Sequence, residues 1–238
     1  MAGIRDEHRD AARIVLTAVA QVRGNPTEDA PYGLAGGNAL IAHGLSRRAT
    51  MDVDIAISEM RGDWKIIEDA IEAALTANGY AVTRVEKTAD LEIFAGIDPD
   101  TGYPEEIGLS EWVVRPPGSP EEVKVQVSNF DLLAAPVPMP GIGPVLALVD
   151  VAGWKTVAFA IGRHLARDIP DMAELLTAYT VDELIELAEK RDPGLRDADL
   201  GAAGRYVNRV RDDALAAVLA GTGRDVGWVR SQLESWPR

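Results

Sequence analysis

The sequence predicts an α/β (α+β) fold, in which a mixed sheet with flanking helices is followed by a C-terminal helical domain. Two observations predict this class. Residues 30–128 alternate short strand-like runs with helical apolar spacing, whereas residues 146–238 show helical spacing throughout. Residues 134–144, between them, are dense in Pro and Gly, and the pattern changes after them. We therefore expect an α/β domain over 1–145 and a helical domain over 146–238.

The α/β domain is predicted to begin with a helix and a strand that leads into a glycine turn. Apolar residues recur at helical spacing over 11–22. Residues 32–35 read as a short strand that runs into Gly36-Gly37. Asn38 is expected to cap a short helix that ends near His43, because its side chain can accept a hydrogen bond from a backbone amide of the first turn.

An acidic strand and an amphipathic helix are predicted next. Residues 52–57 alternate acidic and aliphatic side chains, so one face of that strand carries carboxylates and the other is apolar. Residues 63–78 place their apolar side chains on one helical face, and Gly79 ends the helix. Further strands are predicted over 80–85, 91–95, 111–115 and 122–128.

The second domain is predicted to be helical. Thr180 and Glu183 form the pattern of a capping box, and Asp168 followed by Pro170 fits the start of another helix. The expected helices span 146–163, 168–179, 181–190, 200–220 and 225–236.

Composition restricts the classes of function. The formal net charge is −14, which argues against a non-specific nucleic-acid coat but permits a local basic site. The absence of cysteine excludes disulfides and thiolate metal sites. Charged residues interrupt every apolar run before it could cross a bilayer, and the N-terminal residues lack the apolar stretch of a signal peptide. We expect a cytoplasmic protein with no membrane contact.

The glycine turn and the acidic strand carry the chemistry together. Glycines at a strand-to-helix turn let backbone amides approach a phosphate, and a helix N-terminus adds partial positive charge. Asp52 and Asp54 project from one strand face, where two carboxylates repel each other unless a cation lies between them. Hard oxygen ligands suit Mg²⁺ (or Mn²⁺). Alone, each element reads as a turn or a solvated strand face; together they favour a site for NTP phosphates and a divalent cation.

A second candidate lies in the first helix of the helical domain. Lys155 is the only charged residue between Asp150 and Arg163, and Lys155, Phe159 and Arg163 follow each other at i+4. The two cations therefore lie along one line of the helix. A partly desolvated lysine there can hold a triphosphate or neutralise pyrophosphate. The structural alternative is a lysine that snorkels from an amphipathic helix.

Both regions resemble a known family. Gly36-Gly37-Asn38-Ala39-Leu40 and Arg48-Ala49-Thr50-Met51-Asp52-Val53-Asp54 are similar to the nucleotidyltransferase signature of the DNA polymerase β superfamily. The order of Lys155, Arg163, Arg167-Asp168 and Asp171-Met172 resembles more narrowly the AbiEii/AbiGii toxin branch, which includes the MenT-type toxins. The resemblance covers residues 30–178.

The resemblance implies an enzyme that transfers a nucleotide from NTP to an acceptor hydroxyl, at the 3′ end of tRNA or another RNA. It implies the toxin of a toxin–antitoxin system, controlled by a cognate antitoxin. Carried onto this sequence, it places the nucleotide at Gly36, Gly37, Asn38, Arg48, Thr50 and Lys155. It assigns catalysis to Asp52, Asp54, Lys155 and Asp168, the metal to Asp52 and Asp54, and RNA contacts to Arg47, Arg163 and Arg167. For Asp168, a purely structural role at the helix start stays open beside this one.

One position departs from the family pattern. Superfamily members commonly carry a third carboxylate on a later central strand, where this chain has Gln126. A neutral amide substitutes poorly for a metal-binding carboxylate, and Glu92 is the candidate for supplying the acid from a neighbouring strand.

Two alternative functions follow. A small-molecule adenylyltransferase of the aminoglycoside- or lincosamide-modifying kind shares this fold and the Asp-x-Asp pair, and Glu105, Glu106 and Glu111 could line an acidic pocket for its polycationic acceptor. Gln126 motivates the other alternative, a catalytically degenerate module that binds a nucleotide or a partner.

Overall fold

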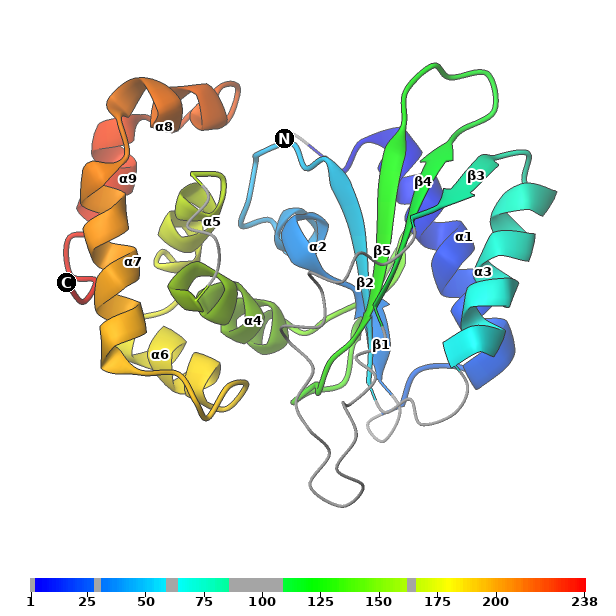
Figure 1. Ribbon diagram of the computed structural model, residues 1–238, viewed down its shortest axis with the longest axis horizontal. Coiled ribbons are helices and arrows are strands. Elements are labelled where there is room, and N and C mark those ends of the chain that lie inside the picture. The colour runs from blue at the N-terminus through cyan, green and yellow to red at the C-terminus, as the bar shows by residue number, and fades with distance from the viewer. Residues whose placement is uncertain (1–2, 28–30, 59–63, 86–108, 162–165) are drawn as a thin grey trace. The chain divides into compact units, whose positions relative to one another are not determined.

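The computed structural model describes residues 3–27, 31–58, 64–85, 109–161 and 166–238 (Figure 1). The chain forms two compact units. The sheet unit consists of Arg5–Ala35 and Met51–Leu146, and the helical unit consists of Met1–Ile4, Gly36–Thr50 and Ala147–Arg238. The predicted division into domains 1–145 and 146–238 stays a prediction.

The sheet unit contains a mixed sheet with the strand order β3-β4-β5-β2-β1-β7-β6. Its strands are β1 (Tyr32–Leu34), β2 (Asp52–Ile57), β3 (Ala81–Arg84), β4 (Leu109–Arg115), β5 (Val123–Asn129), β6 (Val137–Met139) and β7 (Gly143–Val145). β2 runs parallel to β5 and β1 runs parallel to β7, whereas the other pairs are antiparallel. The expected α/β class with a mixed sheet is confirmed.

Alternation along the central strands separates an apolar face from a polar face. In β2, Val53 and Ile55 are buried, whereas Asp52 and Asp54 are only partly buried. Two helices, α1 (Asp6–Arg23) and α3 (Trp64–Ala77), lie side by side, and α1 packs against β2 and β5 (Figure 1). Burial of aliphatic surface between α1 and the sheet stabilises this unit, since each fully buried Val or Ile contributes about 1.5–3 kcal/mol.

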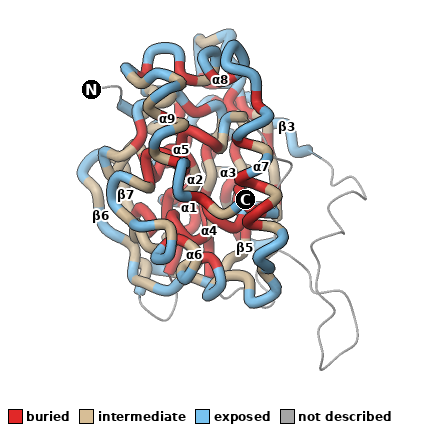
Figure 2. The backbone as a smooth tube through the Cα atoms, turned by 90° about the vertical axis from the view of Figure 1, so that its left-hand side faces the viewer, coloured by how far each residue is buried: buried red, intermediate tan, exposed pale blue. Residues whose placement is uncertain are grey.

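The helical unit is built around two buried helices. Most of α4 (Leu148–Ile161) is buried, and α5 (Asp168–Leu175) is buried from Ile169 onward (Figure 2). The other helices of this unit are α2 (Gly36–Ala42), α6 (Val181–Glu189), α7 (Asp197–Arg209), α8 (Asp212–Leu219) and α9 (Val226–Gln232). The capping box predicted at Thr180 is confirmed, because Thr180 Oγ1 accepts from Glu183 N at 3.2 Å and Glu183 Oε2 accepts from Thr180 N at 2.7 Å.

Two expectations about these elements were wrong, and two strands were not predicted. The unpredicted strands are β6 and β7, and Pro138 is tolerated because β6 is an edge strand. The helix expected over 200–220 is two helices, since Val210 has an extended ψ of 129°. Asn38 does not cap a helix: α2 already begins at Gly36.

Three predicted elements lie wholly or partly outside the described residues. They are the strand expected over 91–95, the first residue of the helix expected over 63–78 and the last two residues of the helix expected over 146–163. Within its described part, the helix expected over 63–78 matches α3, which spans Trp64–Ala77.

Candidate active site

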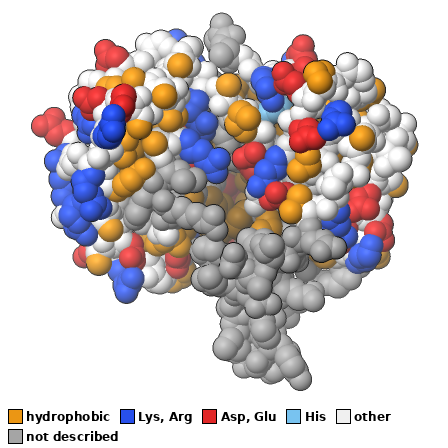
Figure 3. All heavy atoms as spheres, turned by 45° about the horizontal axis from the view of Figure 1, so that its top comes forward, with side chains coloured by type: hydrophobic (Ala, Val, Ile, Leu, Met, Phe, Trp, Pro, Cys, Tyr) orange, Lys and Arg blue, Asp and Glu red, His pale blue; other side chains and the backbone are white. Residues whose placement is uncertain are grey.

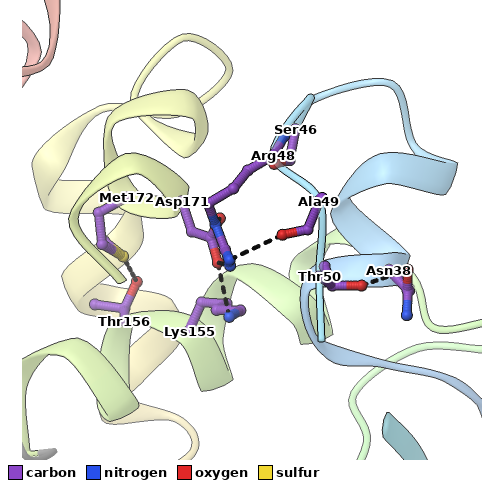
Figure 4. A network of polar contacts seen from close by, with 9 residues as sticks. All are labelled: Asn38, Ser46, Arg48, Ala49, Thr50, Lys155, Thr156, Asp171 and Met172. Carbon is purple, nitrogen blue, oxygen red and sulfur yellow. Dashed lines mark hydrogen bonds and ion pairs between the residues drawn. The ribbon is translucent and has the colours of Figure 1, made fainter. Parts of the chain in front are cut away.

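The glycine turn and Thr50 form one compact element of the helical unit. Gly36 has a φ of 60°, a left-handed conformation that favours glycine. A Cβ added to Gly37 would lie 2.5 Å from Thr50 Cγ2, so only glycine fits against that side chain. Thr50 Oγ1 donates to Asn38 Oδ1 at 2.8 Å, and both residues are buried (Figure 4). The predicted nucleotide-binding residues Gly37, Asn38 and Thr50 are therefore in contact.

The end of α2 leads the chain back toward this turn. Gly44 has a φ of 76°, and Leu45 N and Ser46 N both donate to Leu40 O, which closes the helix at its C-terminus. Ser46 is buried, and its Oγ accepts from Arg48 N at 3.3 Å. These contacts fix the backbone from which the Arg48 side chain projects.

Arg48 and Lys155 meet at a buried carboxylate, that of Asp171 on α5. Arg48 donates from Nε to Asp171 Oδ1 at 3.3 Å and from Nη2 to Oδ2 at 3.1 Å. Lys155 Nζ, on α4, donates to Asp171 Oδ2 at 2.8 Å (Figure 4). Burial alone would raise the pKa of Asp171, but the two cations and their hydrogen bonds outweigh it and hold the pKa below its ordinary value.

Asp168 lies one helical turn before Asp171. It is the first residue of α5, as expected for a helix start, and no side-chain hydrogen bond caps that end of the helix. Burial raises the pKa of Asp168, and neighbouring Asp171 adds to the rise, whereas Lys155, Arg167 and Arg48 oppose it. Asp168 therefore shares the electrostatic environment of the Lys155–Asp171 pair.

The residues expected to contact RNA are only partly described. Arg47 and Arg167 are exposed. Arg163 lies outside the described residues, so its expected alignment with Lys155 has no structural outcome. On the surface in view in Figure 3, local groups of Lys and Arg stand among separate acidic side chains. A net acidic chain thus still presents basic surface locally.

Asp52 and Asp54 lie on the polar face of the sheet unit. β2 and β5 pair in parallel register, with Asp52 opposite Lys124 and Asp54 opposite Gln126. Paired residues on neighbouring strands point to the same face, so the two carboxylates and the Gln126 amide share it. All three side chains are partly buried.

The next strand adds an acid to the same face. Glu111 on β4 pairs with Gln126, and its Oε2 accepts from Lys124 Nζ at 2.6 Å. Sequence reasoning assigned Glu111 only to a hypothetical acidic pocket. Glu92, the expected source of the missing carboxylate, lies outside the described residues.

The donor set of the sheet face fits a divalent cation that also binds phosphate. Among the described residues there is no group of three or more His, Cys, Asp or Glu side chains that could hold a metal ion. Two carboxylates nevertheless suffice for Mg²⁺, which commonly takes one or two protein carboxylates and completes its shell with water and substrate phosphate oxygens. Asp52 and Asp54 are suited to such a shared site.

One pocket of the sheet unit does not involve these residues. Its volume is about 420 Å³, and its lining includes Asp6, Glu7, Asp10, Asn78 and Pro117. None of the predicted site residues lines it.

Comparison with known proteins decides the family. The profile of the family described as nucleotidyl transferase AbiEii toxin, Type IV TA system, matches residues 22–214. The chain belongs to the AbiEii family. None of the curated proteins is detectably similar in sequence. The AbiEii match spans both signature regions, from the glycine turn through Asp171.

Solved structures support the same fold. A Helicobacter pylori protein described as a nucleotidyltransferase has 16% identity and a TM-score of 0.57, with 95% of this chain and 90% of that chain covered. JHP933 from Helicobacter pylori has 15% identity and a TM-score of 0.54, with 97% and 90% covered. At this identity the likeness shows the nucleotidyltransferase fold.

Family and fold together establish the enzyme class. This AbiEii protein is a nucleotidyltransferase that uses an NTP and belongs to a toxin–antitoxin system. No helix within the described ranges is long and apolar enough to cross a membrane.

Sequence reasoning missed the role of Asp171. It placed Asp171 in the family motif but assigned it no partner. Asp171 is fully buried in the run from Ile169 to Leu175, and no pattern in the sequence shows that burial. A buried carboxylate needs a cationic partner, and Lys155 and Arg48 were the two cations already assigned to the site.

Proposed function

We propose that this AbiEii protein transfers a nucleotide from a Mg²⁺-bound NTP to the 3′ end of an RNA, with tRNA as the acceptor, under control of a cognate antitoxin. The observation that carries the proposal is the placement of Asp52 and Asp54 on one face of β2. Asp52 follows Thr50, the partner of the glycine turn, by only two positions in the chain.

The proposed NTP site uses the glycine turn for phosphate. The absence of side chains at Gly36 and Gly37 allows a triphosphate to approach the backbone, and the buried Asn38–Thr50 hydrogen bond fixes the turn. Asp52 and Asp54 would hold the divalent cation. When bound, the cation neutralises the triphosphate and polarises its phosphoryl oxygens.

The transfer step forms one bond and breaks one. The acceptor hydroxyl oxygen bonds to the α-phosphorus while the bond from that phosphorus to the leaving pyrophosphate oxygen breaks, and the hydroxyl proton passes to solvent. Lys155 and Arg48 neutralise the charge that develops on the pyrophosphate. Asp168, beside these cations, is proposed to belong to the same catalytic group. Catalysis rests mainly on positioning and charge neutralisation.

Two observations favour RNA over a small polycation as the acceptor: exposed cations near the proposed site, and an acid of the alternative pocket that is already paired with a lysine. Arg47 and Arg167 are exposed cations close in sequence to Arg48 and Asp168 and are proposed to contact RNA phosphates, together with Arg163. Glu111, one of three acids that would line an aminoglycoside pocket, is paired with Lys124. Glu105 and Glu106 lie outside the described residues.

The test is a panel of acceptors. Purified protein is incubated with Mg²⁺, each α-³²P-labelled NTP in turn, and either total tRNA or an aminoglycoside. We expect label in tRNA, removable by a 3′ exonuclease, and none in the aminoglycoside. Label in the aminoglycoside alone would replace the RNA proposal by the small-molecule alternative. Tight NTP binding without transfer to either would indicate a degenerate module.

A further inference from the structure

In the cluster of Asp171, Lys155 and Arg48, the acid is buried and the two cations are partly exposed. The Asp171 side chain is 0% exposed, whereas its two partners reach solvent: the Lys155 side chain is 18% exposed and the Arg48 side chain is 14% exposed. All three residues belong to the helical unit. Together the buried anion and the two partly exposed cations carry one net positive charge, with Asp168 as the neighbouring acid.

Asp171 joins three separate segments of the chain. It lies on α5, Lys155 lies on α4, and Arg48 lies in the connection after α2. Lys and Arg side chains are long and rotamer-rich, so holding them in one place costs conformational entropy. One buried carboxylate that binds both, with a two-point contact to the guanidinium, fixes both positions at once (Figure 4).

We propose that Asp171 is a positioning residue that holds Lys155 and Arg48 side by side as the receptor for the leaving pyrophosphate. This inference rests on the nucleotide transfer proposed above. Asp171 itself does not touch the substrate or the metal, because it is fully buried and both of its oxygens already accept hydrogen bonds from the two cations.

The receptor matches the chemistry of a polyphosphate. Two adjacent cations favour a ligand that carries more than one negative charge within a few ångströms, as pyrophosphate does. The charge on the pyrophosphate grows during transfer, so cations fixed in advance stabilise the transition state more than bound NTP. Loss of Asp171 should therefore lower kcat and leave NTP binding largely intact.

The first experiment compares Asp171→Asn with Glu174→Gln in the full chain. Glu174 is a matched control on the same helix: its carboxylate is also nearly buried and binds Arg224 at 3.0 and 3.1 Å, away from Lys155 and Arg48. We expect Asp171→Asn to lower kcat by about 100-fold or more, the range for removal of a preorganised charge-stabilising contact. Its Kd for NTP should change by less than roughly threefold, and Glu174→Gln should keep wild-type kcat.

The second experiment asks whether Asp171 acts through its partners. In a Lys155→Met background, which already lacks one cation, adding Asp171→Asn should lower kcat much less than it does in the wild type, because residues that act as a unit are non-additive. This double variant removes a cation together with the anion, so it also covers the case in which Asp171→Asn alone fails to fold. Circular dichroism and NTP binding establish folding for each variant.

The outcomes separate the inference from the proposed function. Fully additive losses, or an Asp171→Asn variant as active as Glu174→Gln, would overturn the positioning role while nucleotide transfer stands. An Asp171→Asn variant that loses NTP affinity and kcat equally would also overturn it. A wild-type protein that transfers no nucleotide to any acceptor would overturn the proposed function and the inference with it.

Discussion

At the scale of single residues, the contact between Gly37 and Thr50 sets the shape of the proposed phosphate site. The position of a Cβ at residue 37 would be only 2.5 Å from Thr50 Cγ2, while its next neighbours, Arg48 Nη2 and Thr50 Cβ, would be 3.6 Å away. The obstacle is therefore a single methyl group. Removing that methyl group should make room for a side chain at residue 37.

The contact between Gly37 and Thr50 predicts that a substitution at residue 37 is harmful and that a second substitution at Thr50 relieves the harm. Gly37→Ala should displace Thr50, break its hydrogen bond to Asn38, and weaken NTP binding by roughly tenfold or more, since one charge-bearing ligand contact is worth about 1.4 kcal/mol or more. Thr50→Ser removes Cγ2 but keeps the hydroxyl, so the Gly37→Ala/Thr50→Ser variant should recover most of the affinity. Equilibrium binding of a fluorescent NTP measures both. No recovery in the double variant would mean that residue 37 acts through something other than this clash.

His8 illustrates a residue whose charge state is set by burial. It lies on α1 with its side chain fully buried. Burial, together with the nearby Arg5, lowers the pKa of His8 from 6.5 to about 4, and the weaker effects of Asp52 and Glu7 oppose this shift. The folded protein therefore holds His8 neutral at pH values where the unfolded chain binds a proton.

The pH dependence of stability follows from this shift. As pH falls from 6.5 toward 4, only the unfolded chain takes up the proton, so the free energy of unfolding falls with pH. Between about pH 7 and about pH 5, His8 should account for a loss of roughly 2 kcal/mol. In urea unfolding, the free energy of unfolding of His8→Gln should depend less steeply on pH than that of the wild type. Parallel curves for wild type and His8→Gln would contradict this account.

At the scale of secondary-structure elements, register brings the acids of the sheet into one row. Asp54 on β2 pairs with Gln126 on β5, and Gln126 pairs with Glu111 on β4. The chain thus has an amide between two acids on the same face. Lys124, opposite Asp52, neutralises Glu111. Because Gln126 is neutral, the row carries less negative charge beside Asp54 than it would with a carboxylate at this position of β5.

Restoring a carboxylate at the middle of the row should strengthen cation binding. Gln126→Asp places an acid directly opposite Asp54, where hard oxygen ligands favour a divalent cation. We expect calorimetric titration with Mn²⁺ in the presence of NTP to show an affinity several-fold higher than that of the wild type. Gln126→Glu offers a second geometry for the same charge, and Glu122→Gln, at an exposed acid next to β5, is the control for a change in net charge. Unchanged Mn²⁺ affinity in both Gln126 variants would show that the cation binds away from Asp54.

Elements with a clear local pattern could be predicted from sequence, and elements set by long-range pairing could not. The acid–aliphatic alternation of β2 and the apolar face of α3 are local signals, and both elements were predicted close to their observed bounds. β6 and β7 are held by pairing with each other and with β1, which the Pro- and Gly-rich run at 134–144 does not reveal. Likewise, no Gly or Pro marks the break between α7 and α8 at Val210, where the backbone is extended.

The candidate site shows the same division. Asp52 and Asp54 were assigned to one face because two-residue periodicity in a strand dictates it. Their neighbours Lys124 and Gln126 come from the register of β2 with β5, which the sequence does not show. The Arg48–Asp171 contact joins residues 123 positions apart, so no pattern in the chain predicts it. The partner could be inferred only from the requirement that a buried carboxylate be neutralised.

At the scale of the whole molecule, segments of the two compact units alternate along the chain. The long C-terminal part of the helical unit begins at Ala147. Gly36–Thr50, however, belongs to the same unit, although it lies between two strands of the sheet. The proposed phosphate-binding turn and the proposed metal ligands are thus adjacent in sequence but belong to different units.

The central claim is that Asp52 and Asp54 are the metal ligands of this nucleotidyltransferase. Isosteric Asp→Asn changes remove a charge without removing volume, so they test this claim with little cost in packing. The exposed Asp131 in the same unit offers a matched control.

The most direct measurement is the rate of nucleotide transfer from α-³²P-labelled NTP to tRNA by Asp52→Asn, Asp54→Asn and Asp131→Asn under identical Mg²⁺ concentrations. We predict that the first two variants are folded and lose transfer by about 1000-fold or more, in line with the loss of a principal charge-stabilising group, whereas Asp131→Asn transfers at the wild-type rate. Wild-type transfer by both Asp52→Asn and Asp54→Asn would contradict the account.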